Sequence, residues 1–122
     1  MIQLLPVTEP AMIDRLNQIY HTNAAYALVC VEKKEIKASC LYDITPQGGE
    51  ICNISTVEPE IFDGLARLAF QKMLEAGVDQ AVFAEFVDPK MLQTLGFVQD
   101  EPYFVQSLSK IIHNCKSCAE EG

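Results

Sequence analysis

Residues 50–77 read EICNISTVEPEIFDGLARLAFQKMLEAG, and this stretch joins a strand to a long helix. Its first part, Glu50 to Val57, is an apolar run typical of a strand, and Pro59 cannot continue a central strand because proline has no amide hydrogen. Apolar residues then recur at helical spacing, with polar residues four apart on the opposite face. Gly77 follows where a left-handed residue commonly ends a helix. The stretch therefore predicts a strand followed by an amphipathic helix with one buried face.

Downstream of this helix, the sequence predicts another strand, a short helix and a closing strand. Gln80 to Phe86 is apolar with little alternation, which is typical of a strand covered on both faces. A strand, helix, strand connection is right-handed by default, so we expect this strand to run parallel to the one before the helix. Asp88-Pro89 suits the start of a short helix that stops at Gly96. Phe97-Val98 and Tyr103 to Ile112 then supply one or two closing strands.

Upstream, the sequence predicts a strand, a helix and two more strands. Ile2 to Val7 alternates weakly, and Thr8 is a suitable N-cap for an amphipathic helix that ends near His21. Tyr26 to Glu32 and Ile36 to Asp43 flank a polar turn, and together with the strand before the long helix they form an antiparallel meander. The predicted fold class is α/β (α+β), with a mixed, mostly antiparallel central sheet and helices on both faces.

Composition limits the class of protein and its partners. The chain has 122 residues, 49% of them hydrophobic, with a net charge of -8, so we expect one domain over residues 1–112 and a polar tail over 113–122. A negative field repels phosphate backbones and anionic lipids, which disfavours nucleic acid and membrane surfaces. No apolar stretch approaches the about 20 residues that span a bilayer, and the N-terminus lacks a signal-type basic region. Since Cys30, Cys40 and Cys52 fall in apolar runs, as reduced cysteines do, we expect a cytoplasmic protein.

The C-terminal segment holds a cluster of soft ligand types. His113, Cys115 and Cys118 offer three ligands, whereas a structural zinc site takes four. A metal site completed by another subunit or by water, a redox-active thiol pair and an ordinary frayed tail are the three interpretations. Because the set is one ligand short and lies in a polar terminus, we expect no metal.

The predicted order of elements, with the triplet Leu95-Gly96-Phe97 closing the short helix, resembles the GNAT superfamily of acyl-CoA N-acyltransferases. The resemblance covers most of the chain by topology and specific residues between Ile54 and Phe97. It implies that acetyl-CoA or another acyl-CoA enters an opening between the strands 51–57 and 80–86. It also implies that pantetheine pairs with backbone amides of the first strand and that pyrophosphate sits at the start of the following helix. The cofactor-binding residues implied in this way are Ser55, Thr56, Val57 and Gly64.

The turn that would receive the pyrophosphate is acidic in this chain. The family pattern has spaced glycines there, following Arg or Gln, whereas residues 58–65 contain one glycine and no arginine. The carboxylates of Glu58, Glu60 and Asp63 stabilise a helix N-terminus themselves, so they take the electrostatic role that a pyrophosphate otherwise fills. Two interpretations stay open for them, charge complementarity with the helix and a site for an acceptor amine.

The resemblance also suggests residues for proton transfer. In many family members a tyrosine three residues before the Leu-Gly-Phe triplet protonates the departing thiolate, and this chain has Leu92 at that position. Tyr103 or Tyr42 is then the candidate replacement acid, and Glu50, on the strand that leads to the opening, is the candidate general base. The alternative for both tyrosines is a partly buried aromatic residue on a sheet.

Two functions follow from these residues. The first is an enzyme that transfers an acetyl group from acetyl-CoA to a small-molecule primary amine, mainly by positioning the reactants. The second is a GNAT-like domain without CoA binding that serves as a protein-interaction or assembly module, as a homodimer through its sheet edge or C-terminal strands. Unpaired amides at Ser55, Thr56 and Val57 would favour the enzyme, and an exposed apolar patch would favour the module.

Overall fold

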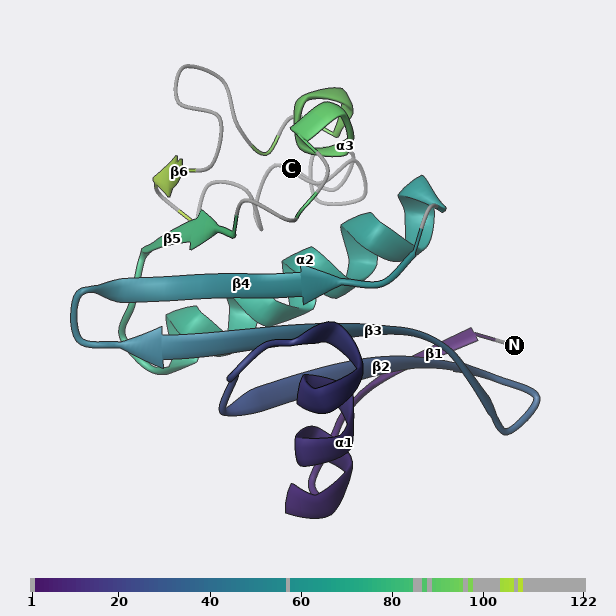
Figure 1. The fold of residues 1–122 in the computed structure, drawn as a ribbon. Helices are drawn as coiled ribbons and strands as arrows, with labels where there is room; N and C mark the ends of the chain where they lie inside the picture. The colour runs from purple at the N-terminus through teal and green to yellow at the C-terminus, as the bar shows by residue number, and fades with distance from the viewer. Residues whose placement is uncertain are drawn as a thin grey trace.

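The strands of the chain form one mixed sheet. The computed structural model describes residues 2–56, 58–84, 87, 89–95, 97, 104–106 and 108. The elements are β1 (Ile2–Pro6), α1 (Pro10–Tyr20), β2 (Tyr26–Glu32), β3 (Glu35–Thr45), β4 (Gly48–Ile54), α2 (Pro59–Glu75), β5 (Gln80–Phe83), α3 (Pro89–Thr94) and β6 (Phe104–Gln106) (Figure 1). The described strands lie in the order β1-β2-β3-β4-β5-β6, and all neighbours are antiparallel except the parallel pair β4 and β5. This confirms the predicted fold class.

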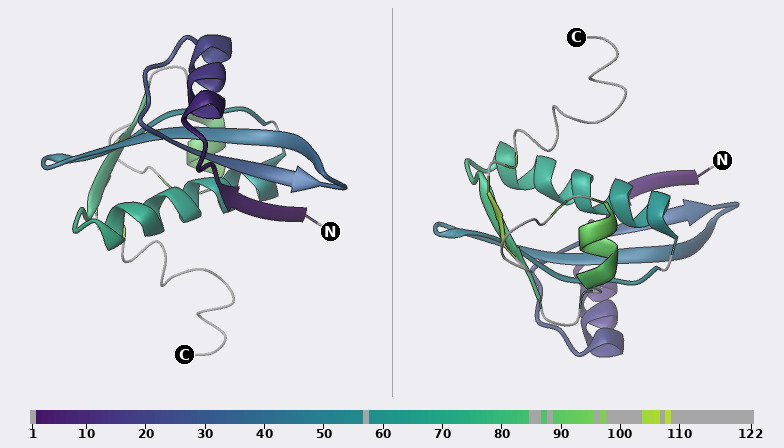
Figure 2. Two further views of the ribbon diagram at one scale, coloured as in Figure 1. Left: turned by 90° about the horizontal axis from the view of Figure 1, so that it is seen from below. Right: turned by 90° about the horizontal axis from the view of Figure 1, so that it is seen from above.

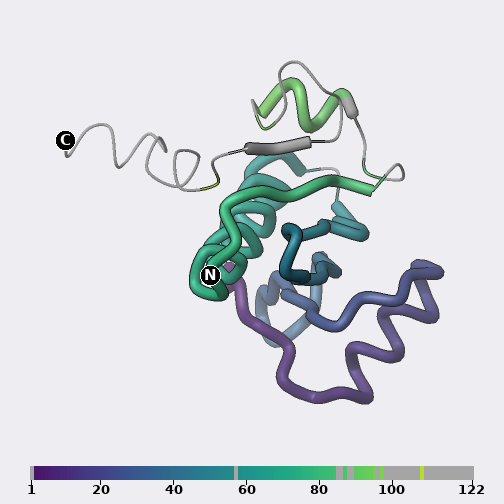
Figure 3. The backbone as a smooth tube through the Cα atoms, turned by 90° about the vertical axis from the view of Figure 1, so that its left-hand side faces the viewer, coloured from purple at the N-terminus to yellow at the C-terminus, as the bar shows by residue number. Residues whose placement is uncertain are grey.

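Helices α1 and α2 cover opposite faces of the sheet, as the views in Figures 2 and 3 show. The α2 face carries the larger core, and α3 lies beside the β5 and β6 end of the sheet (Figure 1). The α1 face has a smaller core built on residues such as Leu16, Val29 and Leu41. Within the described residues, no helix is both long enough and apolar enough to cross a membrane.

Helix α2 is amphipathic, as its spacing predicts. Its buried residues are Ile61, Phe62, Leu65, Ala66, Ala69, Phe70 and Met73. The ring of Phe70 meets those of Phe83 and Phe97 edge-on, at centroid distances of 5.9 and 5.7 Å, a geometry that adds about 0.5–1.5 kcal/mol per aromatic pair to the burial of the rings. After the helix, Gly77 has a φ of 87°, the left-handed conformation expected there.

Helix α1 begins differently from the prediction. Glu9, and not Thr8, is its N-cap, since the carbonyl of Glu9 accepts hydrogen bonds from the amides of Met12 and Ile13, and no side chain caps the helix. The prediction for Thr8 was wrong because Pro10, at the first helical position, sets the start one residue later. The helix ends at Tyr20, close to the predicted end, and His21 caps it with a left-handed φ of 56°.

Several boundaries differ from the predicted ones. Strand β4 ends at Ile54 and not at Val57, and β5 ends at Phe83, because Ala84 already lies outside the ladder. The predictions for Phe86, Asp88, Gly96, Val98 and Tyr103 fall outside the described residues. The division into a domain over 1–112 and a tail over 113–122 stays a prediction for the same reason.

Candidate functional site

Strand β4 is paired over unequal lengths on its two sides. Toward β5, its ladder covers Gly49–Ile51, opposite Ala81–Phe83, and the amide of Ala84 then donates to the carbonyl of Ile51 at 2.9 Å. Toward β3, β4 stays paired to its end at Ile54. Over Cys52–Ile54, no described residue of β5 lies opposite β4. We call this interval the β4–β5 opening (Figure 1).

A β-bulge in β4 lies where the opening begins. Tyr42 pairs with Ile51 and Leu41 pairs with Asn53, so Cys52 is an extra residue between them. Side chains normally alternate between faces, yet Ile51 and Ile54 both enter the core under α2, while Cys52 enters the core under α1. The bulge therefore changes the direction of the strand without losing either isoleucine from the core. Bulges are over-represented beside functional sites, where they re-aim side chains.

Two serines hold the end of β4 against β3. The amide of Ser55 donates to the carbonyl of Ser39 at 2.9 Å, the amide of Ser39 donates to the Ser55 hydroxyl at 2.9 Å, and the two hydroxyl oxygens lie 2.8 Å apart. Ser39 is buried. Because successive residues of a strand direct their amides to opposite sides, the amide of Ile54 faces away from β3, toward the opening.

This geometry changes the prediction for the cofactor-binding amides. The amide of Ser55 donates to the carbonyl of Ser39 on β3, so it does not face the opening and is not one of the unpaired amides that would favour the enzyme. Thr56 accepts a hydrogen bond from the amide of Glu58 through its hydroxyl, at 3.1 Å. Val57 lies outside the described residues. The strand position that presents an amide to the opening is Ile54, one residue before the predicted group.

A cluster of two carboxylates and a thiol lies on the α1 face of β3 and β4. The ligand atoms of Asp43, Glu50 and Cys52 all lie within 4.8 Å of one another. Asp43 and Glu50 are direct cross-strand partners, and like charges in that position destabilise a sheet. A cation placed between them would remove this repulsion. We call these three residues the acidic cluster.

The connection between α1 and β2 is fixed against the acidic cluster. Asn17 accepts hydrogen bonds from the amide of Ala24 at 2.9 Å and the hydroxyl of Thr22 at 2.7 Å, and its own amide donates to the carbonyl of Ala24 at 2.9 Å. The next amide along the chain, that of Ala25, donates to Asp43 Oδ1 at 2.6 Å. The loop before β2 is therefore held by hydrogen bonds beside the acidic cluster.

The thiol of Cys52 remains protonated in this setting. Burial, with the carboxylates of Glu50 and Asp43 beside it, raises the pKa of Cys52 to about 12. Its sulfur lies 3.8 Å from Asp43 Oδ2 and 3.9 Å from Glu50 Oε1, as a weak donor to both. Since metals bind the thiolate, the raised pKa disfavours a thiophilic metal at this cluster.

Tyr42 does not fit the role of replacement acid. It is 4% exposed on the α2 face, where its ring stacks on that of Tyr26 at 5.3 Å, whereas Glu50 lies on the α1 face. Burial is the main cause that raises the pKa of Tyr42 to about 12. A free thiol has a pKa of about 8.5, so this phenol is a weaker acid than the thiol that would form when the CoA thiolate takes its proton. The alternative interpretation, an aromatic residue packed on the sheet, describes Tyr42.

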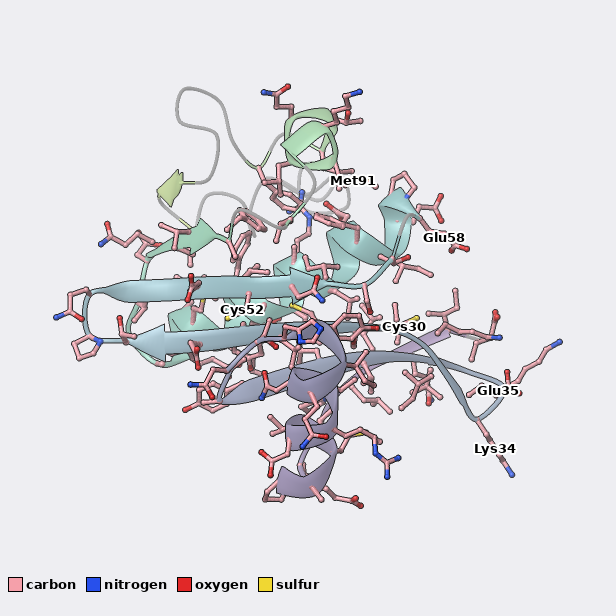
Figure 4. The ribbon with its side chains drawn as sticks, in the orientation of Figure 1. Cys30, Lys34, Glu35, Cys52, Glu58 and Met91 are labelled. Atoms are coloured by element: carbon pink, nitrogen blue, oxygen red, sulfur yellow. The ribbon has the colours of Figure 1, made fainter. Side chains whose placement is uncertain are left out.

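The start of α2 is acidic but not a phosphate turn. Glu58 is the N-cap and Glu60 lies in the first turn, both exposed, and Figure 4 shows Glu58 well separated from Cys52. Asp63 accepts from Arg67 Nε at 3.0 Å, and the guanidinium carbon of Arg67 lies 5.6 Å from the Phe97 ring centroid. Gly64 lies in the second turn, where a β-carbon would come within 2.8 Å of Leu4 Cδ1. Gly64 therefore lies where α2 packs closely on β1, and its role as a cofactor residue stays a prediction.

The remaining candidates fall outside the described residues. These are Tyr103 and the C-terminal His113, Cys115 and Cys118. Asp43, Ser39 and Ile54 were not among the site residues predicted from the sequence. Asp43 could have been identified from the sequence, because it lies opposite Glu50 in the predicted hairpin and so forms an unfavourable like-charge pair. Ser39 and Ile54 could not, since their roles depend on the register that the bulge sets.

No protein-family profile and no curated protein matches the chain. Among solved structures, the chain is similar to the solution NMR structure of "Putative N-Acetyl Transferase YhhK from E. coli Bound to Coenzyme A". The TM-score is 0.50, with 13% sequence identity, over 88% of this chain and 97% of that one. At this identity the likeness shows the fold alone. The chain therefore has a GNAT-like fold, as its order of elements predicted.

Proposed function

We propose that this GNAT-like chain binds an acyl-CoA, such as acetyl-CoA, in the β4–β5 opening and transfers the acyl group to a primary amine held at the acidic cluster. The observation that carries the proposal is the end of β4, where β3 stays paired, no described residue of β5 lies opposite and the amide of Ile54 faces the opening. An extended amide chain such as pantetheine can pair with a strand edge of this kind. The coenzyme A bound to the E. coli structure supports the choice of ligand.

The acidic cluster supports an amine as the acceptor. A protonated amine has three donors and one positive charge, which matches two carboxylates and relieves their mutual repulsion. Asp43 is already oriented by the amide of Ala25, whereas Glu50 is exposed and can turn toward a ligand. We therefore assign Asp43 to binding the ammonium group and Glu50 to accepting its proton.

The proposed transfer needs no co-reactant beyond the two substrates. Glu50 first accepts one proton from the ammonium group and passes it to solvent. The neutral amine nitrogen then attacks the thioester carbonyl, a C–N bond forms, the C–S bond breaks, and the electron pair leaves with the CoA sulfur. The nitrogen loses its second proton to Glu50, which balances the proton that the thiolate gains. We retain Tyr103 as the proposed acid that protonates the thiolate, while Tyr42 is excluded by its place on the opposite face. Most of the rate enhancement would come from positioning the two reactants.

The first prediction concerns cofactor binding. Acetyl-CoA and free CoA should each raise the melting temperature in a saturable way, because a ligand that binds only the folded chain at 100 times its dissociation constant stabilises it by about 2.7 kcal/mol. A thermal-shift titration with both ligands measures this, and adenosine diphosphate serves as the control for the nucleotide alone. The absence of any shift at about 1 mM ligand would contradict the proposal.

The acidic start of α2 favours a second candidate, a GNAT-like assembly module without CoA binding. Glu58 and Glu60 lie at the start of the helix that follows β4, where their charge repels a pyrophosphate. If CoA binds despite this charge, the double variant Glu58→Gln/Glu60→Gln should bind CoA about tenfold more tightly, since each charge near a helix terminus is worth about 0.3–1 kcal/mol. Isothermal titration calorimetry measures the change.

A matched control exists for this second prediction. Glu9 is the N-cap of α1, which also has no side-chain cap, and Asp14 is exposed on the same helix. The variant Glu9→Gln/Asp14→Asn removes the same total charge from the opposite side of the sheet and should leave CoA affinity unchanged. Equal gains in both variants would show a general charge effect and no pyrophosphate position at α2.

We also propose a cytoplasmic location. Cys30, Cys40 and Cys52 are free and buried, and burial raises the pKa of Cys40 and Cys30 as well as that of Cys52. Buried protonated thiols persist in a reducing compartment and behave there as small hydrophobic residues. Nucleic acid and membrane surfaces are not proposed as partners, because of the net charge of -8.

A further inference from the structure

Strand β1 forms one edge of the sheet, and its unpaired backbone groups have a regular pattern. Its pairing with β2 is antiparallel and continuous from Ile2 to Pro6, and the amide of Val7 donates to the carbonyl of Ala27 at 2.9 Å. By alternation, Gln3 and Leu5 also face β2, while Ile2, Leu4 and Pro6 direct their backbone groups outward. Proline has no amide hydrogen, so Pro6 occupies an outward position at no cost to the β1–β2 ladder.

This edge lacks the usual protection against strand pairing. Natural edge strands carry charged side chains, bulges or a cover, whereas β1 has no charged residue and its register has no shift. Ile2 is 49% exposed and Leu5 is 43% exposed, on opposite faces of the strand. No described element lies on the outer side of β1. The edge therefore combines unpaired backbone groups with exposed apolar side chains.

We infer that β1 is a dimer interface that pairs antiparallel with β1 of a second copy of this chain. With a two-fold axis at Leu4, the two strands overlap over their full length, and the two Leu4 residues exchange both backbone hydrogen bonds. The amide of each Ile2 then donates to the carbonyl of Pro6 in the other copy, a position where proline needs only to accept. Ile2 packs beside Pro6 and Leu5 beside Gln3 across the interface, so each copy supplies the same patch.

The absence of charged residues on β1 makes this edge the most favourable surface for self-association. Two copies with a net charge of -8 repel each other, so association is least opposed where the surface is uncharged. Every residue from Ile2 to Thr8 is uncharged. The dimer should therefore become more stable as salt screens the remaining repulsion, which is the opposite of the salt dependence expected for a basic protein partner.

Sedimentation equilibrium of the full chain tests the inference. From about 1 μM to about 1 mM protein, a range that covers weak dimers, we expect a mass that rises from 13.6 kDa toward twice that value, at lower concentrations in about 0.5 M than in about 0.05 M NaCl. The variant Leu5→Glu places two like charges diagonally across the axis and should raise the dissociation constant at least about tenfold. The control Ile36→Glu alters a similarly exposed residue, at 47%, on β3 and should change it less than about twofold.

A second variant tests the backbone hydrogen bonds between the two β1 strands without adding a charged side chain. Ile2→Pro removes an outward amide and replaces the Ile2 side chain without adding charge, so the β1–β2 ladder and the melting temperature should be kept, while the dissociation constant rises as in Leu5→Glu. A wild-type chain that stays monomeric at about 1 mM in about 0.5 M NaCl would overturn the inference. Equal weakening by Leu5→Glu and Ile36→Glu, or unchanged association in Ile2→Pro, would also overturn it. CoA titrations are independent of these outcomes.

Discussion

Replacing Glu50 with glutamine is expected to lower kcat/KM for acyl transfer about a hundredfold, because general base catalysis contributes roughly 10²–10⁴-fold. Glutamine keeps the shape of the side chain and its exposure, but it cannot accept the proton of the amine. It also removes the negative charge opposite Asp43. The release of CoA thiol from acetyl-CoA, with lysine, spermidine and glucosamine as acceptors, measures the rate.

The control for Glu50→Gln is Glu35→Gln, which removes an exposed carboxylate at the far end of β3 and should leave the rate unchanged. Free CoA should shift the melting temperature of Glu50→Gln as it does that of the wild type, since Glu50 lies on the α1 face and is not assigned to the cofactor. Full activity in Glu50→Gln would show that another group takes the proton.

Replacing Gly49 with alanine should lower the free energy of unfolding by about 2–3 kcal/mol, near the upper end of the cost of overpacking a core. Gly49 is buried, and an added β-carbon would overlap the sulfur of Met73, with Met73 Cε and Cγ at only 2.7 and 2.9 Å. Met73 is fully buried in the core under α2, so its side chain can move only by displacing its neighbours. Urea unfolding followed by circular dichroism measures the change.

Two further variants test this packing. Gly77→Ala adds a methyl group where nothing lies within 4 Å, so its cost is limited to the backbone strain of a φ of 87°, about 1 kcal/mol. In the double variant Gly49→Ala/Met73→Val, the shorter side chain makes room for the new methyl group, so the loss should be smaller than the sum of the two single losses. Additive losses would show that Gly49 and Met73 do not compete for space.

Much of this fold could be predicted because its signals are local. The apolar spacing of Phe62, Leu65 and Met73 gives the buried face of α2, and Gly77 gives its end. The antiparallel meander and the parallel β4–β5 pair followed from the order of strands and helices. Strand ends were less predictable. Ser55 and Thr56 have the β-branched or small polar character of a strand continuation, and Ser55 still bonds to Ser39 of β3, yet the strand itself ends at Ile54.

The candidate site was only partly predictable for a related reason. Glu50 was predicted from its position on the strand, and the sequence alone did not show that Tyr42, near a bulge, lies on the opposite face of the sheet. Nor did it show that Leu4, 60 positions before Gly64, occupies the space beside that glycine. Such long-range contacts leave no trace in local sequence spacing.

The short ladder between β4 and β5 also bears on the order in which the molecule assembles. Strands β1 to β4 and helix α1 are joined by hairpins and short connections. Closing such short loops costs little entropy, which allows these strands to pair early in folding. Strand β5 reaches β4 only after the whole of α2 has been traversed and then pairs over Gly49–Ile51. We therefore expect the amides of β5 to become protected from hydrogen exchange later than those of β2 and β3 during refolding, and to open first under native conditions.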